Sequence, residues 1–275
     1  MTTSTPGKSQ AKGFWQSNKW LFVRRMSQFF VLTLFLLGPW FGIWIIKGNL
    51  SASLILDTVP LTDPLLALQM WFASGTLAKE VWIGLLVVTV FYGLVGGRLF
   101  CSWACPVNLV TDGAHWVRGR LKLKSYAKLT RNLRYWVLGM VLLVSALLGV
   151  IAWEPVNPVS IMHREIIFGL GMGWTILVGI FLLDAFFAER AWCSHLCPMG
   201  ATYSLVGQWS PLRIRSEKEK CDECGDCYYI CPEPQVIVPA IRGKDVTILD
   251  AMCTNCGRCI DICPQEVFRF GKRQS

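Results

Sequence analysis

The sequence predicts an α-helical integral membrane protein in which four transmembrane helices form two repeated hairpins, followed by a C-terminal α+β domain. The chain of 275 residues is 53% hydrophobic, and its mean hydropathy of +0.43 is well above that of soluble proteins. Four long apolar runs alternate with polar loops, and a cysteine-rich stretch follows the last run. We expect residues 1–25 to form a basic cytoplasmic N-terminus, 26–200 the membrane domain and 201–275 the C-terminal domain.

The N-terminal stretch predicts a cytoplasmic start and a first membrane span. Residues 1–25 contain five basic residues and no acid. The apolar run of 18 residues from Phe29 to Ile46 would be about 27 Å long as a helix, close to the thickness of a bilayer core. Arg24-Arg25 also resembles the start of a twin-arginine export signal. We favour a membrane anchor, because the run is long for a signal peptide and Trp40 and Trp44 fit an interfacial aromatic belt.

The remaining apolar runs predict three further spans, at residues 81–97, 135–153 and 168–187. Segment 98–134 contains eight basic residues and one acid, so the positive-inside rule places it in the cytoplasm. Segment 47–80 has three acids and two bases, and we expect an extended periplasmic loop there. Both termini are then cytoplasmic, in the inner membrane of a bacterium. Membrane topology explains the net charge of +9, with lipid and not nucleic acid as the partner.

A nine-residue motif occurs twice, after the second and the fourth apolar run. RLFCSWACP at residues 98–106 aligns with RAWCSHLCP at residues 190–198, which predicts two parallel hairpins related by an axis along the membrane normal. In each copy, the proline disfavours helical geometry at the cysteine before it. The four cysteines of this CxxxCP motif are Cys101, Cys105, Cys193 and Cys197. They would meet at the cytoplasmic membrane surface if the hairpins pack pseudo-symmetrically.

Three interpretations of these four cysteines remain open at this point. They could form a further metal site, a redox-active dithiol and disulfide pair, or buried structural residues. The repetition with matched flanking residues argues against the last interpretation. Asp184 lies within the fourth run, where an ionisable side chain is costly; it is either a proton acceptor for a quinol or the partner of a base such as Arg98 or Arg190. We interpret these two arginines as anchors at the inner membrane face.

The most specific pattern lies between Cys221 and Pro264. CDECGDCYYICP and CTNCGRCIDICP both follow the spacing C-x₂-C-x₂-C-x₃-C-P, which is the ligand pattern of bacterial two-cluster ferredoxins. In that pattern the fourth cysteine of each run binds the other cluster. The sequence therefore predicts two [4Fe–4S] clusters in a ferredoxin-like C-terminal domain, rather than structural zinc, which usually takes two separated ligand pairs.

The crossover assigns four cysteines to each cluster. The first set is Cys221, Cys224, Cys227 and Cys263, and the second set is Cys253, Cys256, Cys259 and Cys231. Because clusters with free thiolate ligands need reducing conditions, a cytoplasmic location fits. Between the runs, β-prone residues 235–238 and 245–248 predict a hairpin. Acidic residues around the first run, compared with Arg258 in the second, predict that the first cluster is the harder to reduce.

The combination resembles the NapH family, the ferredoxin-type membrane components of periplasmic nitrate reductase systems. The resemblance extends from Trp20 to about Phe268 and includes RRMSQFFVL, GPWFG, DTVPLTDPL, RLFCSWACPVN, NPVS and CPEP. More broadly, the chain is similar to the polyferredoxin group that includes NosR and CcoG. The family implies quinol oxidation, with electrons passing toward the nitrate reductase through a NapG-type iron–sulfur protein and a NapC-type tetrahaem protein.

The sequence thus predicts a membrane-bound iron–sulfur subunit, a quinol dehydrogenase component that does not itself reduce nitrate. A cytoplasmic location of the clusters leaves the route across the membrane open, since the chain has no C-x-x-C-H haem motif. The alternative is a redox-maintenance or maturation protein that supplies electrons for cofactor assembly, with a cytoplasmic ferredoxin-type protein as a further possible partner.

Overall fold

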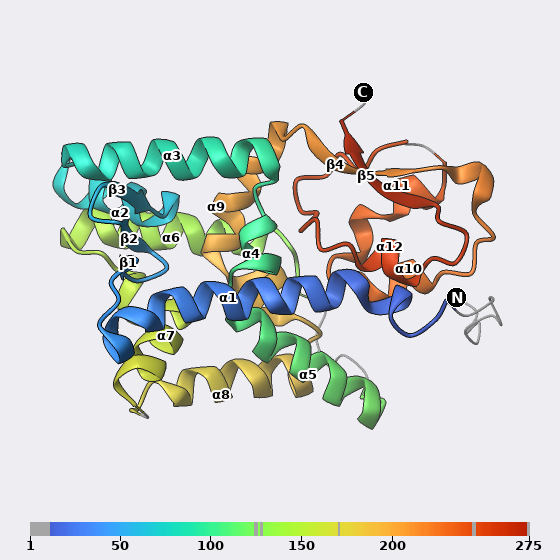
Figure 1. Cartoon of the computed structure of the whole chain (residues 1–275), viewed down its shortest axis with the longest axis horizontal. Coiled ribbons are helices and arrows are strands. Elements are labelled where there is room, and N and C mark those ends of the chain that lie inside the picture. Colours follow the sequence, from blue (N-terminus) through green and yellow to red (C-terminus); the bar gives the residue numbers. More distant parts are fainter. Residues whose placement is uncertain (1–11, 124–125, 127–128, 170, 244–245, 274–275) are drawn as a thin grey trace. The chain divides into compact units, whose positions relative to one another are not determined.

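The computed structural model describes residues 12–123, 126, 129–169, 171–243 and 246–273 (Figure 1). The chain divides into two compact units. The first comprises Met1–Ser27, Tyr92–Trp103 and Ser204–Ser275, and the second comprises Gln28–Phe91 and Ala104–Tyr203. Two segments that are distant in sequence therefore belong to the unit that contains the cysteine-rich C-terminus.

The second unit is mainly helical, and the axes of its helices α3, α6 and α8 lie along the horizontal of the view in Figure 1. Its elements, some of which extend into the first unit, are α1 (Lys19–Phe41), β1 (Ile46–Gly48), β2 (Ala52–Ile55), β3 (Val59–Thr62), α2 (Pro64–Ser74), α3 (Lys79–Val95), α5 (Val107–Leu121), α6 (Leu133–Leu148), η2 (Glu154–Val156), α7 (Pro158–Phe168), α8 (Trp174–Leu182), η3 (Leu183–Phe187), η4 (Trp192–Leu196) and α9 (Pro198–Val206). The segments η3 and η4 are π-helical.

Helices fill the four predicted apolar runs, but their lengths differ from the prediction. Only Gln16–Phe41 is long and apolar enough to cross a membrane among the described residues, while Leu133–Leu148 and Trp174–Phe187 are apolar but shorter. Helix α1 begins ten residues before the predicted span and ends before Gly42, whose φ is +74°. Glycine at φ > 0 is a common helix terminator, and Gly149 ends α6 in the same way. Four membrane crossings therefore remain a prediction.

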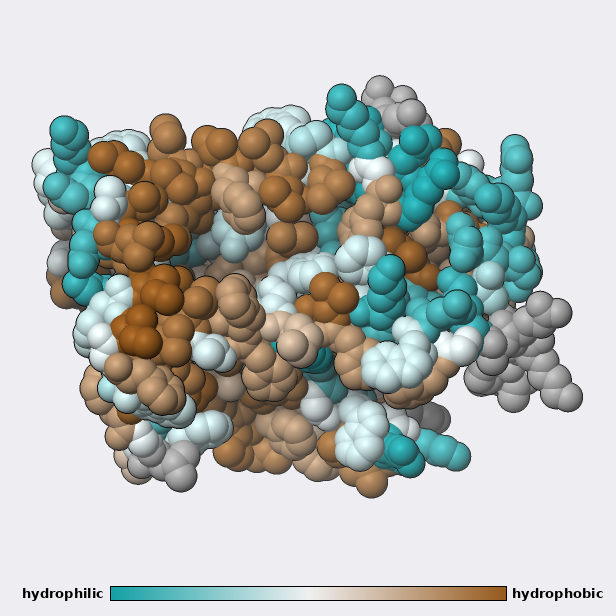
Figure 2. All heavy atoms as spheres, in the orientation of Figure 1, coloured by the Kyte–Doolittle hydropathy of each residue, from teal (hydrophilic) through white to brown (hydrophobic). Residues whose placement is uncertain are grey.

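Two helices of this unit expose continuous apolar faces. On α3, Trp82, Leu86 and Val90 are 52%, 65% and 52% exposed, and their spacing of four residues places them on one face. On α6, Trp136, Met140, Leu143 and Leu147 form a similar exposed face. Figure 2 shows hydrophobic side chains gathered over α3. Soluble monomers rarely expose such contiguous apolar surface.

The segment predicted to be an extended loop, residues 47–80, is instead folded. Strands β1, β2 and β3 form an antiparallel sheet in that order, and α2 follows directly. The Asp63 side chain accepts hydrogen bonds from the amides of Leu65 and Leu66 and so caps α2, while Pro64 occupies its first turn. The prediction of a loop was wrong because the sheet uses long-range pairing that composition does not reveal.

The first unit is built around a two-stranded antiparallel sheet. Its further elements are η1 (Gln16–Asn18), α4 (Leu99–Trp103), η5 (Gly207–Trp209), β4 (Leu212–Ser216), η6 (Lys218–Lys220), α10 (Asp226–Ile230), η7 (Pro234–Val236), α11 (Val238–Ile241), α12 (Arg258–Ile262) and β5 (Phe268–Lys272). Strand β4 pairs with β5, and Ile214, Ile237, Ile248 and Phe268 form a core with cysteines of both runs.

The predicted hairpin between the two cysteine runs is wrong for its first strand. Residues 235–238 belong to the short helical segments η7 and α11. Pro234 and Pro239 lie in the first turns of η7 and α11, where proline is compatible with a helix start. Thr247 forms an isolated bridge with Arg215 of β4, whereas residues 244–245 of the predicted second strand and turn lie outside the described residues.

Candidate metal centres

Two cavities in the first unit are each lined by four cysteines. Cys221, Cys224, Cys227 and Cys263 line one, with about 320 Å³ of space outside protein atoms, part of it open to solvent. Cys231, Cys253, Cys256 and Cys259 line the other, with about 340 Å³ of such space. The structure thus brings together the two sets of four that the crossover pattern assigns, each with three cysteines from one run and the fourth from the other.

The local backbone explains this crossover. In both runs a glycine in left-handed geometry, Gly225 at φ +82° or Gly257 at φ +74°, starts a short helix that carries the third cysteine inward. The fourth cysteine, Cys231 or Cys263, ends that helix in an extended conformation. Proline follows both, and it disfavours helical geometry at the residue before it. The chain therefore turns away from its own cavity at the fourth cysteine and delivers it to the other.

The pKa values of these thiols indicate which kind of group they can bind. Burial raises the pKa of Cys227 to about 12 and that of Cys253 to about 11. Burial also raises the pKa of Cys231 and Cys259, and the other cysteines of their own cavity act in the same direction. Four thiolates in so small a space repel one another unless a cationic centre lies between them. The donor sets therefore fit a cofactor that is bound by thiolates.

The spacing of the thiols fits a cluster better than a single ion. No group of three or more His, Cys, Asp or Glu side chains is placed to hold one metal ion in the described part of the chain. Tetrahedral zinc with Zn–S bonds of about 2.3 Å would bring the sulfurs within about 4 Å of one another. Sulfurs spread around a cavity leave room for an extended metal–sulfide core.

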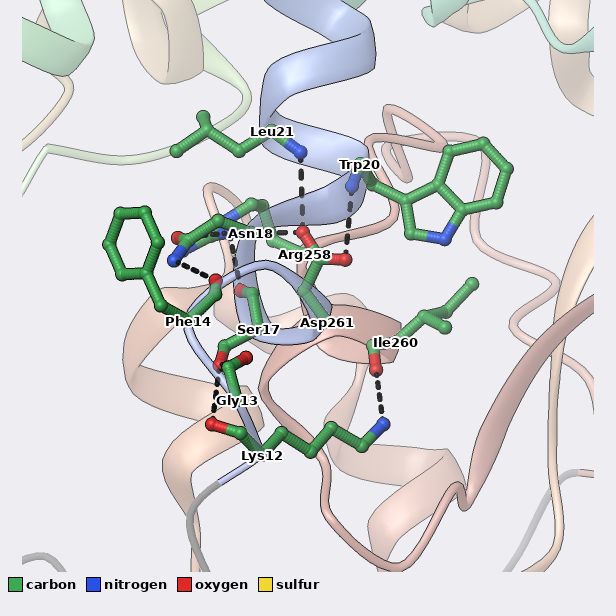
Figure 3. Close-up of polar contacts among 10 residues, drawn as sticks. All are labelled: Lys12, Gly13, Phe14, Ser17, Asn18, Trp20, Leu21, Arg258, Ile260 and Asp261. Atoms are coloured by element: carbon green, nitrogen blue, oxygen red, sulfur yellow. Dashed lines mark hydrogen bonds and ion pairs between the residues drawn. The ribbon is translucent and has the colours of Figure 1, made fainter.

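The N-terminal segment packs on α12, the helix that carries Cys259 of the second set (Figure 3). The carboxylate of Asp261 accepts hydrogen bonds from the amides of Trp20 and Leu21, at 3.0 and 3.2 Å. These amides lie in the first turn of α1, where helices lack internal partners, so Asp261 caps α1 from a distant part of the chain. Arg258 pairs with Asp261 at 3.0 Å and donates to the carbonyl of Ser17. The sequence offered no signal for this contact.

Arg98 lies inside the same unit, close to the cavity of the second cysteine set. Its Nη1 is 2.7 Å from Oε1 of Glu233, and both side chains are only 2% exposed. Glu233 lines the cavity of the second set, and Gln235 donates to its other oxygen. The interpretation of Arg98 as a simple anchor at the membrane face misses this buried ion pair.

The CxxxCP cysteines are divided between the two units. Cys101 lies in α4 of the first unit, whereas Cys105, Cys193 and Cys197 belong to the second. Cys193 lies in η4, and Cys197 ends it in an extended conformation, as the proline after it predicts. Gln28 donates to the Cys105 carbonyl, and Cys193 lies 3.8 Å from the Thr111 hydroxyl. Convergence of the four thiols remains a prediction.

Asp184 is 1% exposed and lies in η3. Its Oδ1 accepts from the Trp192 amide at 2.9 Å, while its Oδ2 is buried without a hydrogen-bond partner among the described residues. Arg118 donates to the main-chain carbonyls of Asp184 and Ala185. Arg190 forms an ion pair with Asp112 at 2.9 Å. Asp184 thus joins η3 to η4, which holds Cys193.

Comparisons with known proteins place these features in a family. Residues 80–124 and 170–217 match the 4Fe-4S binding domain family, and each of these segments contains one CxxxCP motif. Residues 213–264, which hold both ferredoxin-like runs, match the 4Fe-4S dicluster domain family. The chain is therefore an iron–sulfur protein by both matches. No solved structure matches it significantly.

Three curated relatives match nearly the whole chain. The ferredoxin-type protein NapH of Escherichia coli is 45% identical, over 97% of this chain and 94% of its own length. NapH of Haemophilus influenzae is 46% identical, over 95% and 92%. The methylamine utilization ferredoxin-type protein MauN of Paracoccus denitrificans is 49% identical, over 99% and 98%.

Proposed function

Because the chain belongs to the family of ferredoxin-type proteins that includes NapH and MauN, we propose that it is a membrane-bound electron-transfer subunit with two [4Fe–4S] clusters. The observation that carries this proposal is the pair of cavities with four cysteines each. Electron transport by a ferredoxin-type protein is the activity common to the family. Our proposal concerns the number of clusters, their ligands and their redox partners.

Each cavity would hold one cluster through its own four cysteines. The first would be bound by Cys221, Cys224, Cys227 and Cys263, and the second by Cys253, Cys256, Cys259 and Cys231. When bound, the clusters supply one-electron transfer without making or breaking bonds to a substrate. The chain's own contribution is to supply the thiolates and to hold them by the left-handed turns at Gly225 and Gly257.

We place the helical unit in the bacterial inner membrane, with several crossings and both termini in the cytoplasm. The length and hydropathy of Gln16–Phe41 and the exposed apolar faces of α3 and α6 support this placement, since lipid is the natural solvent for such faces. A cysteine-labelling experiment tests it. A cysteine introduced at Thr58 should react with an impermeant maleimide added to intact spheroplasts, and one introduced at Lys122 should react only after lysis.

We propose that the reductant is a quinol in the bilayer and that Asp184 accepts a proton from it. The uncapped Oδ2 of Asp184, buried next to η4, supports this role, because a buried carboxylate oxygen without a donor can take a proton. Following the relatives named NapH, electrons would pass to a NapG-type iron–sulfur protein and a NapC-type tetrahaem protein, and so toward the periplasmic nitrate reductase.

The test is quinol oxidation by the purified holoprotein. A reduced quinol analogue should reduce the clusters of the wild type. Asp184→Asn should slow this reduction about tenfold or more and leave the cluster spectra unchanged, because it removes the proton acceptor. Quinol oxidation that survives Cys224→Ser, together with failed maturation of a partner enzyme, would support the redox-maintenance alternative.

A second candidate function concerns the pathway that is served. The relatives named MauN are 44–49% identical to this chain. The NapH proteins are 45–46% identical to it, so the two groups are about equally similar. The same electron-transfer module could therefore serve methylamine utilization. Deletion of the gene in its own host distinguishes the two: growth by nitrate respiration is lost in one case, and growth on methylamine in the other.

A further inference from the structure

Segment 98–103, which contains the first cysteine of the first CxxxCP motif, contacts the ligand loop of the second cavity. This ligand loop, residues 252–255, carries Cys253 and leads to Cys256. Three side chains from Arg98 to Trp103 donate hydrogen bonds to three of its carbonyls: Arg98 Nη1 to Met252 at 2.9 Å, Ser102 Oγ to Thr254 at 2.7 Å and Trp103 Nε1 to Asn255 at 3.1 Å. The carbonyls of the loop thus point toward α4.

The contact between α4 and the ligand loop is buried and closely packed. Arg98, Ser102 and Asn255 are 1–2% exposed, so these polar groups depend on one another and not on water. Gly96 has φ +136°, and a Cβ at this position would lie 2.5 Å from Nδ2 of Asn255. Only glycine tolerates both the backbone geometry and this approach, so the chain before α4 is shaped to meet the loop.

One peptide plane links these hydrogen bonds to the cysteine sulfur. In a trans peptide the C=O and N–H groups point in opposite directions. The Thr254 carbonyl accepts a hydrogen bond from Ser102, and the Asn255 N–H on the other side of that plane acts on the Cys253 sulfur and lowers the pKa of this thiol. The Cys253 thiol itself donates to Oδ1 of Asn255 at 3.5 Å. The thiol of Cys253 stands here for the thiolate that would bind iron.

A hydrogen bond to a ligating sulfur stabilises the more negative, reduced state of a cluster and so raises its reduction potential. A buried guanidinium acts in the same direction, and Arg98 is held next to the cavity by Glu233 and the Met252 carbonyl. Because Glu233 is itself negative and lines the cavity, the net charge of that pair is small. The directed amide is therefore the larger influence that this segment exerts.

We propose that Ser102, supported by Arg98 and Trp103, is a positioning residue for the second iron–sulfur site: it fixes the Thr254–Asn255 peptide so that its amide stays on the Cys253 sulfur and keeps that site easier to reduce. This inference rests on the proposed function, since it presupposes that the second set of cysteines binds a cluster. It gives the first CxxxCP segment a role that does not depend on what its own cysteines bind.

The first cavity provides an internal reference. Glu223 occupies the position in the first run that Asn255 occupies in the second, and both have left-handed geometry, at φ +59° and +48°. The Glu223 side chain, however, is 72% exposed and pairs with Lys218 at the surface. Changes in α4 should therefore leave the first site unaffected.

The test is a redox titration of the holoprotein monitored by EPR, with the step of the second site identified by its loss in Cys256→Ala. Ser102→Ala removes the hydroxyl without adding volume. We expect both clusters to be retained. The equilibrium constant for reduction of the second site alone should fall about three- to tenfold, which lowers its reduction potential by about 30 to 60 mV for a one-electron couple. Trp103→Phe removes one further hydrogen bond to the loop and should shift the same step in the same direction by less.

The matched control is Ser194→Ala, which makes the same change in the second copy of the motif and should move neither step. Unchanged steps in Ser102→Ala and Trp103→Phe, or equal shifts of both steps, would overturn the inference. Loss of the second cluster alone in Ser102→Ala would support it, because positioning is then required for binding. A wild-type protein without two [4Fe–4S] clusters would contradict the proposed function itself, and the inference with it.

Discussion

The two four-cysteine cavities share a ligand pattern and differ in what surrounds them. The loop of the first contains Glu223, which is exposed and held by a surface pair with Lys218. The loop of the second is held by buried hydrogen bonds from α4 and lies beside α12, where Asp261 caps the start of α1. The same sequence pattern thus yields one site whose ligand loop carries an exposed side chain, and one whose ligand loop and helix are held by hydrogen bonds to α4 and to the first turn of α1.

The surroundings of the two sites also differ in chemistry. The second site touches the segments that lead into α1 and follow α3, while the first is flanked by exposed Tyr228 and Tyr229. The acids around the first run, Asp222, Glu223 and Asp226, predict a lower reduction potential for the first site than for the second.

The largest expected effect is on the buried ion pair of the second site. Arg98→Met leaves Glu233 buried without its partner, which should destabilise the first unit by about 3–5 kcal/mol. The denaturation midpoint of the holoprotein measures this loss. Arg190→Met, at the aligned position of the second motif, should cost less, because the Arg190–Asp112 pair is 10% and 19% exposed. Equal losses in the two variants would show that the deeper burial of the Arg98–Glu233 pair has no energetic weight.

Removal of the clusters should produce a pH dependence that the holoprotein lacks. The folded apoprotein holds Cys227 and Cys253 with pKa values of about 12 and about 11, against 9.0 for an unperturbed thiol. The unfolded chain therefore releases protons from about pH 9, whereas the folded chain does not. The folded state then binds more protons, so its stability should fall as pH rises above 9.

Urea denaturation of the iron-free protein at pH 7, 8, 9 and 10 measures this effect. The midpoint should be flat up to pH 8 and should decrease above pH 9. A midpoint that rises with pH would mean that the thiols are ionised in the folded apoprotein, which would contradict the burial of the cysteines.

A smaller effect is expected at the cap of α1. Asp261→Ala removes the acceptor of two helix amides and the partner of Arg258, and should cost about 1–2 kcal/mol. Tyr229 occupies the position in the first run that Asp261 occupies in the second, and it is 63% exposed. Tyr229→Ala should therefore change stability by less than about 0.5 kcal/mol. Thermal melts of the two holoprotein variants compare them, and a larger loss for Tyr229→Ala would contradict the role of Asp261 as the cap that holds α12 to the start of α1.

The smallest effect is expected at the surface of the first site. Glu223→Gln removes one exposed charge near that cluster, so its reduction potential should rise slightly, and the rise should shrink at high ionic strength because exposed charges are screened. EPR titration at low and high salt measures it. A shift that is insensitive to salt, or that appears in the second site, would contradict the exposed position of Glu223.

The cysteine sets could be predicted from the sequence because the spacing of each run is local and the turns at Gly225 and Gly257 follow from it. The start of α1 could not be predicted from the sequence, because its cap, Asp261, lies about 240 residues away in the chain. The partners Arg98 and Glu233 were also missed, since they are 135 residues apart and no local pattern links them. Hydropathy found the helices of the four apolar runs, but it found neither α2 and α5 nor the glycines that end α1 and α6.

The most direct test of the account is the iron and acid-labile sulfide content of anaerobically purified protein in which Cys101, Cys105, Cys193 and Cys197 are replaced by serine. Two four-cysteine cavities predict about eight irons and eight sulfides per chain in this variant, with the EPR signals of two reduced [4Fe–4S] clusters. Four irons or fewer, or zinc in place of iron, would contradict the claim that both cavities hold such clusters.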